Sequence, residues 1–403
     1  MSPGMAIRRR AILAGVPALM SRARAQTGLP VVRIGVLWDR TGTGAVTSGL
    51  DQIVAARLAV DDFGHLSRGY PVELLDGEFE RRPDQAVAIA RKWFDEEAVA
   101  AIVDLPGTAA PVQVQELARA RDRTVLNTGS FNAALTGASC SPTATHWMED
   151  TRALTRAMTL GMVAEGVKSW FLVVPDDVMA LAFQADATAA IESTGGRIVG
   201  FARHPADGGS ATRPLTSARE SGADAIGLCA MGNALTAQIR TARDLGLFDR
   251  SKAVCAYAAG IKDIHALGAR ESHGLWIVTG FYWDRTDRTR SFASRFNEVT
   301  GRMPDKPYAA TYAAIEHFLR LVEAADMIGG AALNVGLRRE PAYFFGVNGR
   351  LRIDGRLLLD VGLYRVKSPE EVSGAWDYYK QIRVIPAADV FRPVARGSCS
   401  LTP

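Results

Sequence analysis

Metal-binding and catalytic motifs are missing from this 403-residue chain. Its four cysteines form no CxxC pair and its six histidines include no close pair, so we expect no metal site. The nucleophile elbow G-x-S-x-G and the zinc-protease motif H-E-x-x-H are also absent. We therefore expect neither an enzyme nor a cofactor. A secreted hydrolase built on Asp104, Asp176 and Asp263 is the weaker alternative, because each of these also has a cap or turn role.

Long apolar runs and basic blocks are missing as well. Crossing a bilayer takes about 20 apolar residues, and no segment reaches that length. The formal charge is +4, but five arginines and no acids lie in residues 1–25, so the remainder carries −1. Without a basic block, we expect no nucleic-acid partner.

Residues 1–25 have the layout of an export signal. Three arginines at Arg8 to Arg10 precede the apolar stretch Ala11 to Met20, and the small-residue run "ARA" ends at Ala25. Both the twin-arginine and the general secretory route fit this leader. We expect cleavage near Ala25 and a mature protein, beginning at Gln26, in the periplasm.

The loop in "VRIGVLWDRTGTGAVTSG", residues 32–49, lacks the third glycine of a dinucleotide site. Gly42 and Gly44 are present, but Thr47 occupies the third glycine position. Asp76 lies too far along the chain to serve as the ribose ligand. A nucleotide cofactor is therefore not expected, and the loop is instead a candidate rim for another ligand.

Strand-like and helix-like segments alternate along most of the chain. The alternation restarts after residue 150, which predicts an α/β protein with two doubly wound parallel-sheet lobes. A later stretch, residues 351–367, reads as a hairpin that turns at Asp354 and Gly355.

The four cysteines differ in their surroundings. Cys229 and Cys255 lie in apolar strand-like runs, which is typical of buried free thiols. Cys140 and Cys399 lie in small, polar, loop-like segments. Spacing alone cannot choose among the three possible connectivities. Our hypothesis is one disulfide, Cys140 to Cys399, which would attach the tail to the body.

From residue 31 almost to the end, the chain resembles the periplasmic substrate-binding proteins of the branched-chain amino acid (Leu/Ile/Val-binding) type, which serve ABC importers. The stretches that carry the resemblance include "AARLAVDDFG", "RPDQAVAIARKWFDEEAVAAIVDLP", "VLNTGSFNAALTG", "DIHALGARESHGLWIVTGFYWD" and "RSFASRFNEVTGRMPDKPYAATYAA". The resemblance implies a type I periplasmic-binding-protein fold, in which two lobes joined by three crossovers close on a ligand.

The resemblance also suggests where the lobes divide. We expect crossovers near residues 146–150, 278–282 and 345–351. Lobe one then comprises residues 31–148 and 280–345, lobe two residues 149–278 and 346–390, and the tail residues 391–403.

In amino-acid binders of this type, lobe-one loops hold the ligand carboxylate through hydroxyl and N–H groups. Here the corresponding residues are Gly107 and Thr108 after the third strand, and Ser130, Phe131 and Asn132 after the fourth. Phe131 stands at the position where the family has a hydroxyl.

Lobe two of such proteins commonly supplies an acid for the ligand ammonium. The matching loop, residues 258–260, has no carboxylate, and an unpaired buried ammonium is costly, so a carboxylate without an amine fits better. Asp177 is a further candidate for this side of the site. Tyr257, Tyr282 and Trp283 are candidates for the wall around an apolar or aromatic body.

The sequence thus predicts an extracytoplasmic receptor that delivers an amino-acid-like, aromatic or other organic acid to an ABC permease in the inner membrane. We expect a small-molecule ligand and a monomer. A ligand-sensing subunit of a membrane signalling system remains an alternative, because the same binding and closure would serve it.

Overall fold

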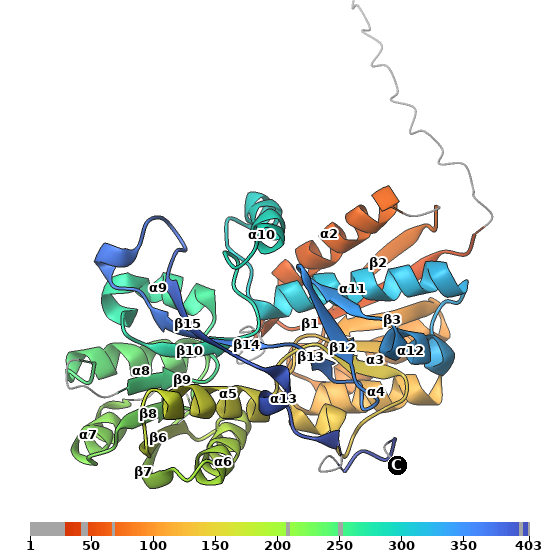
Figure 1. Cartoon of the computed structure of the whole chain (residues 1–403). Coiled ribbons are helices and arrows are strands. Elements are labelled where there is room, and N and C mark those ends of the chain that lie inside the picture. The colour runs from red at the N-terminus through yellow and green to blue at the C-terminus, as the bar shows by residue number, and fades with distance from the viewer. Residues whose placement is uncertain are drawn as a thin grey trace, which may run out of the picture.

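The computed structural model describes residues 29–41, 47–66, 69–206, 210–248, 253–394 and 398–401. The expected export signal, residues 1–25, and the glycines at 42 and 44 lie outside these ranges. Figure 1 shows two α/β bodies side by side, the orange and cyan elements forming one and the green elements the core of the other. No helix in the described ranges has the length and apolarity needed to cross a membrane.

Lobe one is built on a parallel five-stranded sheet with the order β2-β1-β3-β4-β5. All six residues of β3 are buried, as expected for a parallel strand covered on both faces. The strands are β1 (Val32–Trp38), β2 (Val72–Glu78), β3 (Val99–Asp104), β4 (Thr124–Asn127) and β5 (Ala144–His146).

Six helices and one short 3-10 turn accompany the first sheet. They are α2 (Leu50–Leu66), α3 (Pro83–Asp95), α4 (Ala109–Ala120), η1 (Ala133–Thr136), α10 (Asp287–Thr300), α11 (Lys306–Ala325) and α12 (Gly330–Arg339). Ala86, Ala90 and Trp93 are buried and form the inner face of α3. Trp93 packs so closely on β1 that a Cβ at Gly35 would lie 2.4 Å from its ring.

Lobe two is built on a seven-stranded sheet with the order β15-β14-β10-β9-β8-β6-β7. β6 to β10 run parallel, whereas β14 and β15 are antiparallel additions at one edge. The strands are β6 (Ser169–Pro175), β7 (Arg197–His204), β8 (Ala225–Leu228), β9 (Ala253–Ala256), β10 (Trp276–Thr279), β14 (Val361–Val366) and β15 (Tyr379–Ile385). The helices are α5 (Thr151–Ala164), α6 (Val178–Ser193), α7 (Thr212–Glu220), α8 (Gly232–Asp244), α9 (Ile261–Ser272) and α13 (Ala387–Val390), with a 3-10 turn, η2 (Pro369–Glu371).

A third, three-stranded sheet consists of β11 (Ala342–Phe344), β12 (Val347–Leu351) and β13 (Leu357–Leu358). β12 and β13 pair antiparallel across the turn at Asp354 and Gly355, which confirms the predicted turn. The hairpin is shorter than expected, since β13 ends at Leu358 and residues 361–366 form β14 of the seven-stranded sheet. Because β12 pairs with β11, the chain joins the seven-stranded sheet only at β14. The third crossing therefore follows β13, later than the 345–351 expected from the sequence.

Two lobes of alternating strands and helices confirm the α/β fold class expected from the sequence. Cys140 and Cys399 form a disulfide in the structure, with their Cα atoms 5.5 Å apart. It attaches the end of the chain to the segment before β5. Cys229 and Cys255 are free and buried.

Candidate functional site

Two cavities lie between the lobes. The larger, of about 360 Å³, is bounded by residues 106–110 after β3 on lobe one and residues 177–179 after β6 on lobe two. The smaller, of about 50 Å³, lies beside the crossings, with residues 148–149 and 278–279 in its wall. We call them the large cavity and the hinge cavity. Both lie at the carboxyl ends of parallel strands, where open α/β sheets bind their ligands.

The loop between β3 and α4 has an unusual backbone. Asp104 and Leu105 adopt left-handed φ angles of 82° and 64°, followed by Gly107 at 89°. Each such non-glycine residue costs about 1–3 kcal/mol, and such strain clusters at ligand sites. The Asp104 carbonyl holds the loop in place by accepting hydrogen bonds from the N–H groups of Thr128 (3.1 Å) and Gly129 (3.0 Å). The loop delivers Gly107 and Thr108 to the large cavity.

The Asp104 side chain stabilises the loop after β3 without contacting either cavity. This side chain is fully buried, lines neither cavity, and accepts hydrogen bonds from the Ser48 hydroxyl and, at 3.3 Å, from Gln52 Nε2. Burial raises the pKa of this carboxyl well above its ordinary value. Asp104 therefore joins the loop after β3 to the start of α2, a positioning role that does not require the hydrolase assignment considered above.

The N-terminus of α4 opens into the large cavity. Thr108 is its N-cap residue, yet the Thr108 hydroxyl makes no capping hydrogen bond, and Ala109 and Ala110 of the first turn also line the cavity. The first N–H groups of a helix lack partners within it and carry partial positive charge. The hydroxyl and these N–H groups together suit a carboxylate.

Arg81 adds a full positive charge to the same cavity. It lies in the loop after β2 with a left-handed φ of 58°, is exposed, and lines the large cavity. Its neighbour Arg82 is paired with Asp84 at 3.0 Å, whereas Arg81 has no acidic partner in the ranges that the structure describes. Arg81 was not among the site residues expected from the sequence. Its position in the loop after a strand, three residues beyond Glu78, was the available signal.

Ser130 and Asn132 hydrogen-bond to the loop between β3 and α4. The Ser130 hydroxyl donates to the Gly107 carbonyl at 2.7 Å, and Asn132 Nδ2 donates to the Thr108 carbonyl at 3.0 Å. Neither side chain lines a cavity. The two side chains therefore hold the loop that carries Thr108 in position.

Asp177 faces the large cavity from lobe two, as the N-cap of α6. Its carboxylate accepts hydrogen bonds from the N–H groups of Met179 (2.9 Å) and Ala180 (2.8 Å). The two helix N-termini that border the cavity therefore differ. That of α6 has its own carboxylate cap, whereas that of α4 has no side-chain cap.

Aromatic rings form part of the hinge cavity. Phe131 from lobe one and Tyr257 from lobe two both line it. Phe183 of α6 lies between them, 6.0 Å from the Phe131 ring and stacked 6.1 Å from the Tyr257 ring. The structure thus brings Phe131 and Tyr257 together in an apolar wall between the lobes.

The loop at residues 258–260 contains no acid. Asp305, at the N-terminus of α11, lies against this loop. Asp305 lines the hinge cavity, and its carboxylate accepts a hydrogen bond from the Ile261 N–H at 2.7 Å. Burial raises its pKa to about 6, although the charge of Lys262 and backbone hydrogen bonds oppose this shift. Asp263 is turned away and accepts a hydrogen bond from the Gly260 N–H at 2.9 Å.

Glu149 is the other acid of the hinge cavity. It is paired with Lys306 at 2.9 Å, and both side chains are buried, at 3% and 5% exposure. Both acids that line this cavity, Asp305 and Glu149, are therefore already engaged within the protein.

Tyr282 and Trp283 line neither cavity. They follow β10, which ends at Thr279. The Tyr282 ring lies 4.9 Å from the Tyr379 ring, and Trp283 Nε1 donates to the Trp376 carbonyl at 2.9 Å. Their packing is with the C-terminal strands of lobe two.

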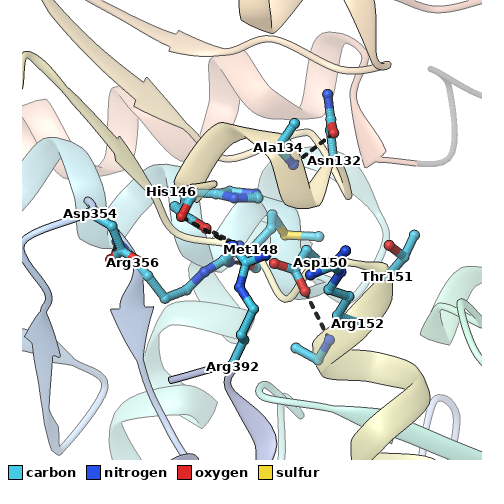
Figure 2. Close-up of polar contacts among 12 residues, drawn as sticks. Asn132, Ala134, His146, Met148, Asp150, Thr151, Arg152, Asp354, Arg356 and Arg392 are labelled. Carbon is cyan, nitrogen blue, oxygen red and sulfur yellow. Dashed lines mark hydrogen bonds and ion pairs between the residues drawn. The ribbon is translucent and has the colours of Figure 1, made fainter. Parts of the chain in front are cut away.

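The first crossing is joined to the turn between β12 and β13 by an ion pair. Figure 2 shows Arg356, from the turn between β12 and β13, reaching the Met148 carbonyl and the Asp150 carboxylate. Asp150 also caps α5 through the Ala153 N–H at 2.8 Å. His146 is buried beside this pair, and its Nε2 lies 2.7 Å from the Ser130 carbonyl. Burial lowers the pKa of His146 well below its ordinary value, so its neutral form is favoured.

Two parallel-sheet lobes, three crossings and cavities at the facing strand ends define a two-lobed solute-binding protein. The chain belongs to the periplasmic binding protein family, whose model matches residues 31–371. This is a family of transporter substrate-binding proteins rather than enzymes. No curated protein matches the chain.

Solved structures agree with this membership. The chain is similar to a branched-chain amino acid ABC transporter periplasmic ligand-binding protein from Burkholderia xenovorans, with 29% identity over 92% of this chain and 99% of that one, and a TM-score of 0.86. A periplasmic binding protein from Burkholderia mallei has 29% identity at the same coverage and a TM-score of 0.84. A Rhodopseudomonas palustris solute-binding protein in complex with 4-hydroxybenzoate shares the fold, with 15% identity over 89% and 97% of the two chains and a TM-score of 0.77.

Proposed function

We propose that this protein is an extracytoplasmic receptor that captures a small carboxylate-bearing solute between its lobes and delivers it to an ABC importer. The observation that carries the proposal is that Arg81 and the N-terminus of α4, which has no side-chain cap, line the same cavity. A charge-assisted hydrogen bond is roughly twice as strong as a neutral one, so these groups favour an anion. Asp39 and Asp177 also line the cavity, but both carboxylates already accept hydrogen bonds, Asp39 from Thr41 and Asp177 from the first turn of α6. The cavity of about 360 Å³ has the size of a small-molecule site.

An acid without an amine fits the rest of the cleft best. The two acids of the hinge cavity are engaged, Asp305 by the start of α9 and Glu149 by Lys306, and the loop at residues 258–260 has none. An ammonium buried there would lack a free counter-charge, which is costly. The apolar wall at Phe131 and Tyr257 suits an aliphatic or aromatic body.

Transport would follow from differential affinity. A ligand held by both lobes shifts the population toward the closed form, which a membrane permease can recognise. The expected export signal and cleavage near Ala25 place the mature protein in the periplasm in this account. The protein would act without catalysis, since its role is binding and release.

The test is calorimetric titration of residues 26–403 with matched ligands. For each skeleton the set contains the acid, its carboxamide and its α-amino acid, for example 3-phenylpropionate, 3-phenylpropionamide and phenylalanine. We expect at least one acid in the panel to bind, and its amide and amino-acid analogues to bind at least tenfold more weakly. Equal binding of acid and amide would refute the carboxylate assignment.

A further inference from the structure

A third cavity, of about 200 Å³, lies on lobe one away from the cleft. Its walls come from α2, α10, α11, β11 and the turn after β11, and it shares no residue with the large cavity or the hinge cavity. Figure 1 shows α10 beside α2 and the near end of α11. We call it the α10 cavity. Nothing in the proposed function uses it.

The charges around the α10 cavity do not cancel. Asp62 is paired with Arg295 at 2.8 Å, and Glu316 is paired with Arg320 at 2.5 Å. Arg288 also lines the cavity and has no acidic partner in the described part of the chain; its guanidinium lies 5.1 Å from the centre of the Tyr343 ring. Arg320 lies outside the lining. Counted with it, the groups around the cavity carry three positive and two negative charges, so the charge of Arg288 is left over and favours an anion.

Two hydroxyl groups accompany Arg288. The Tyr343 hydroxyl is a buried atom with no hydrogen-bond partner among the described residues. Such a group is costly unless water or a ligand satisfies it. Ser291 lies one helical turn after Arg288 on α10 and also lines the cavity. A guanidinium and two hydroxyls can together bind a carboxylate.

The remaining wall consists of aromatic rings, one of which is carried by a strained turn. Phe345 has a left-handed φ of 45° and precedes Gly346 at 96°, in a turn where the first position normally favours Asn, Asp or Gly. The strained backbone places the Phe345 ring 4.9 Å from Phe292 and stacked 5.4 Å from Tyr312. All three rings line the cavity, so a flat apolar body has a surface to pack on.

We propose that the α10 cavity is a second ligand site, which binds a small organic carboxylate with a flat apolar body through Arg288, Ser291 and Tyr343. The site is independent of the cleft, since it is complete within lobe one.

The test uses 4-fluorobenzoate as the probe and ¹⁹F NMR on residues 26–403, with 4-fluorobenzamide as the uncharged analogue. We expect Arg288→Gln to weaken probe binding at this site about tenfold to hundredfold, the range for a lost charged hydrogen bond. Tyr343→Phe should weaken it severalfold, and the amide should not bind. The control is Arg339→Gln, which removes an exposed arginine of α12 that lines none of the three cavities.

Cleft variants separate this proposal from the proposed function. Thr108→Val and Arg81→Gln should leave the Arg288-dependent signal unchanged, whether or not the cleft binds the probe. Probe binding that is absent, or that is unaffected by Arg288→Gln and Tyr343→Phe, would overturn the second site.

Discussion

The Asp305 carboxylate, at the N-terminus of α11 in lobe one, accepts a hydrogen bond of 2.7 Å from the Ile261 N–H at the start of α9 in lobe two. Gly260 makes this contact possible, because a Cβ there would lie 2.6 Å from Asp305 Oδ2. The two lobes are therefore joined through a helix N-terminus and a carboxylate beside the hinge cavity.

This contact predicts a pH-dependent contribution to stability. Burial raises the Asp305 pKa from 3.8 to about 6, so the folded state holds the proton more tightly than the unfolded state. The favourable contribution is therefore largest at low pH and is lost as the pH rises through about 6. Asn at this position does not titrate. The stability of Asp305→Asn relative to the wild type should increase by about 2 kcal/mol between pH 4 and pH 7.

Urea unfolding at several pH values measures this difference. Asp287→Asn is the matched control, because that carboxylate is 98% exposed on α10. Parallel stability curves for the wild type and Asp305→Asn would show that the carboxyl does not titrate in this range.

Arg81 and Thr108 should each contribute to affinity without supporting the fold. Arg81→Gln removes the positive charge of the large cavity and should weaken binding of a carboxylate about tenfold to hundredfold. Thr108→Val keeps the shape but removes the hydroxyl, and should weaken binding about fivefold to tenfold. The measurement is calorimetric titration, with Arg82→Gln as the control because Arg82 is paired with Asp84. Unchanged affinity in both variants would remove the α4 N-terminus from the site.

The pair of Arg356 and Asp150 should be important for stability. Arg356 is 1% exposed, so Arg356→Met leaves the Asp150 charge buried without its partner. Breaking such a pair costs about 3–5 kcal/mol. The double variant Arg356→Met/Asp150→Asn should recover part of this loss in urea unfolding. Equal stability of the single and double variants would mean that the isolated charge is not the cause.

The disulfide predicts a thiol count. Mature protein prepared under oxidising conditions and then unfolded should show two free thiols, those of Cys229 and Cys255. Replacing both Cys140 and Cys399 by serine should lower the free energy of unfolding by about 2–4 kcal/mol. A count of four free thiols would rule the bridge out.

Much of the fold could be predicted because a strand buried on both faces is a continuous apolar run in the sequence. The run "VAAIVD" predicts β3, and the loop after it identified Gly107 and Thr108 as candidates. The strand-end rule requires only the order of strands and helices, which the alternating pattern of the sequence supplies.

Other parts of the site depend on contacts between segments that are far apart in the sequence, which the local pattern does not indicate. Arg81 resembles any loop arginine until the fold brings it to the same cavity as Asp177. Asp305 comes from a segment 44 residues beyond its partner Ile261. Tyr282 and Trp283 have the composition of a ligand wall. Their partners come from the end of the chain: Tyr282 packs on Tyr364 of β14 and Tyr379 of β15, and Trp283 donates to the Trp376 carbonyl just before β15.

The most direct test of the carboxylate site is a crystal structure of residues 26–403 with the tightest-binding acid of the panel. We predict that the ligand lies between the lobes, with its carboxylate within hydrogen-bond distance of the Thr108 hydroxyl and the first N–H groups of α4, and with Arg81 beside it. A ligand outside the large cavity, or one whose carboxylate points away from α4, would contradict the account.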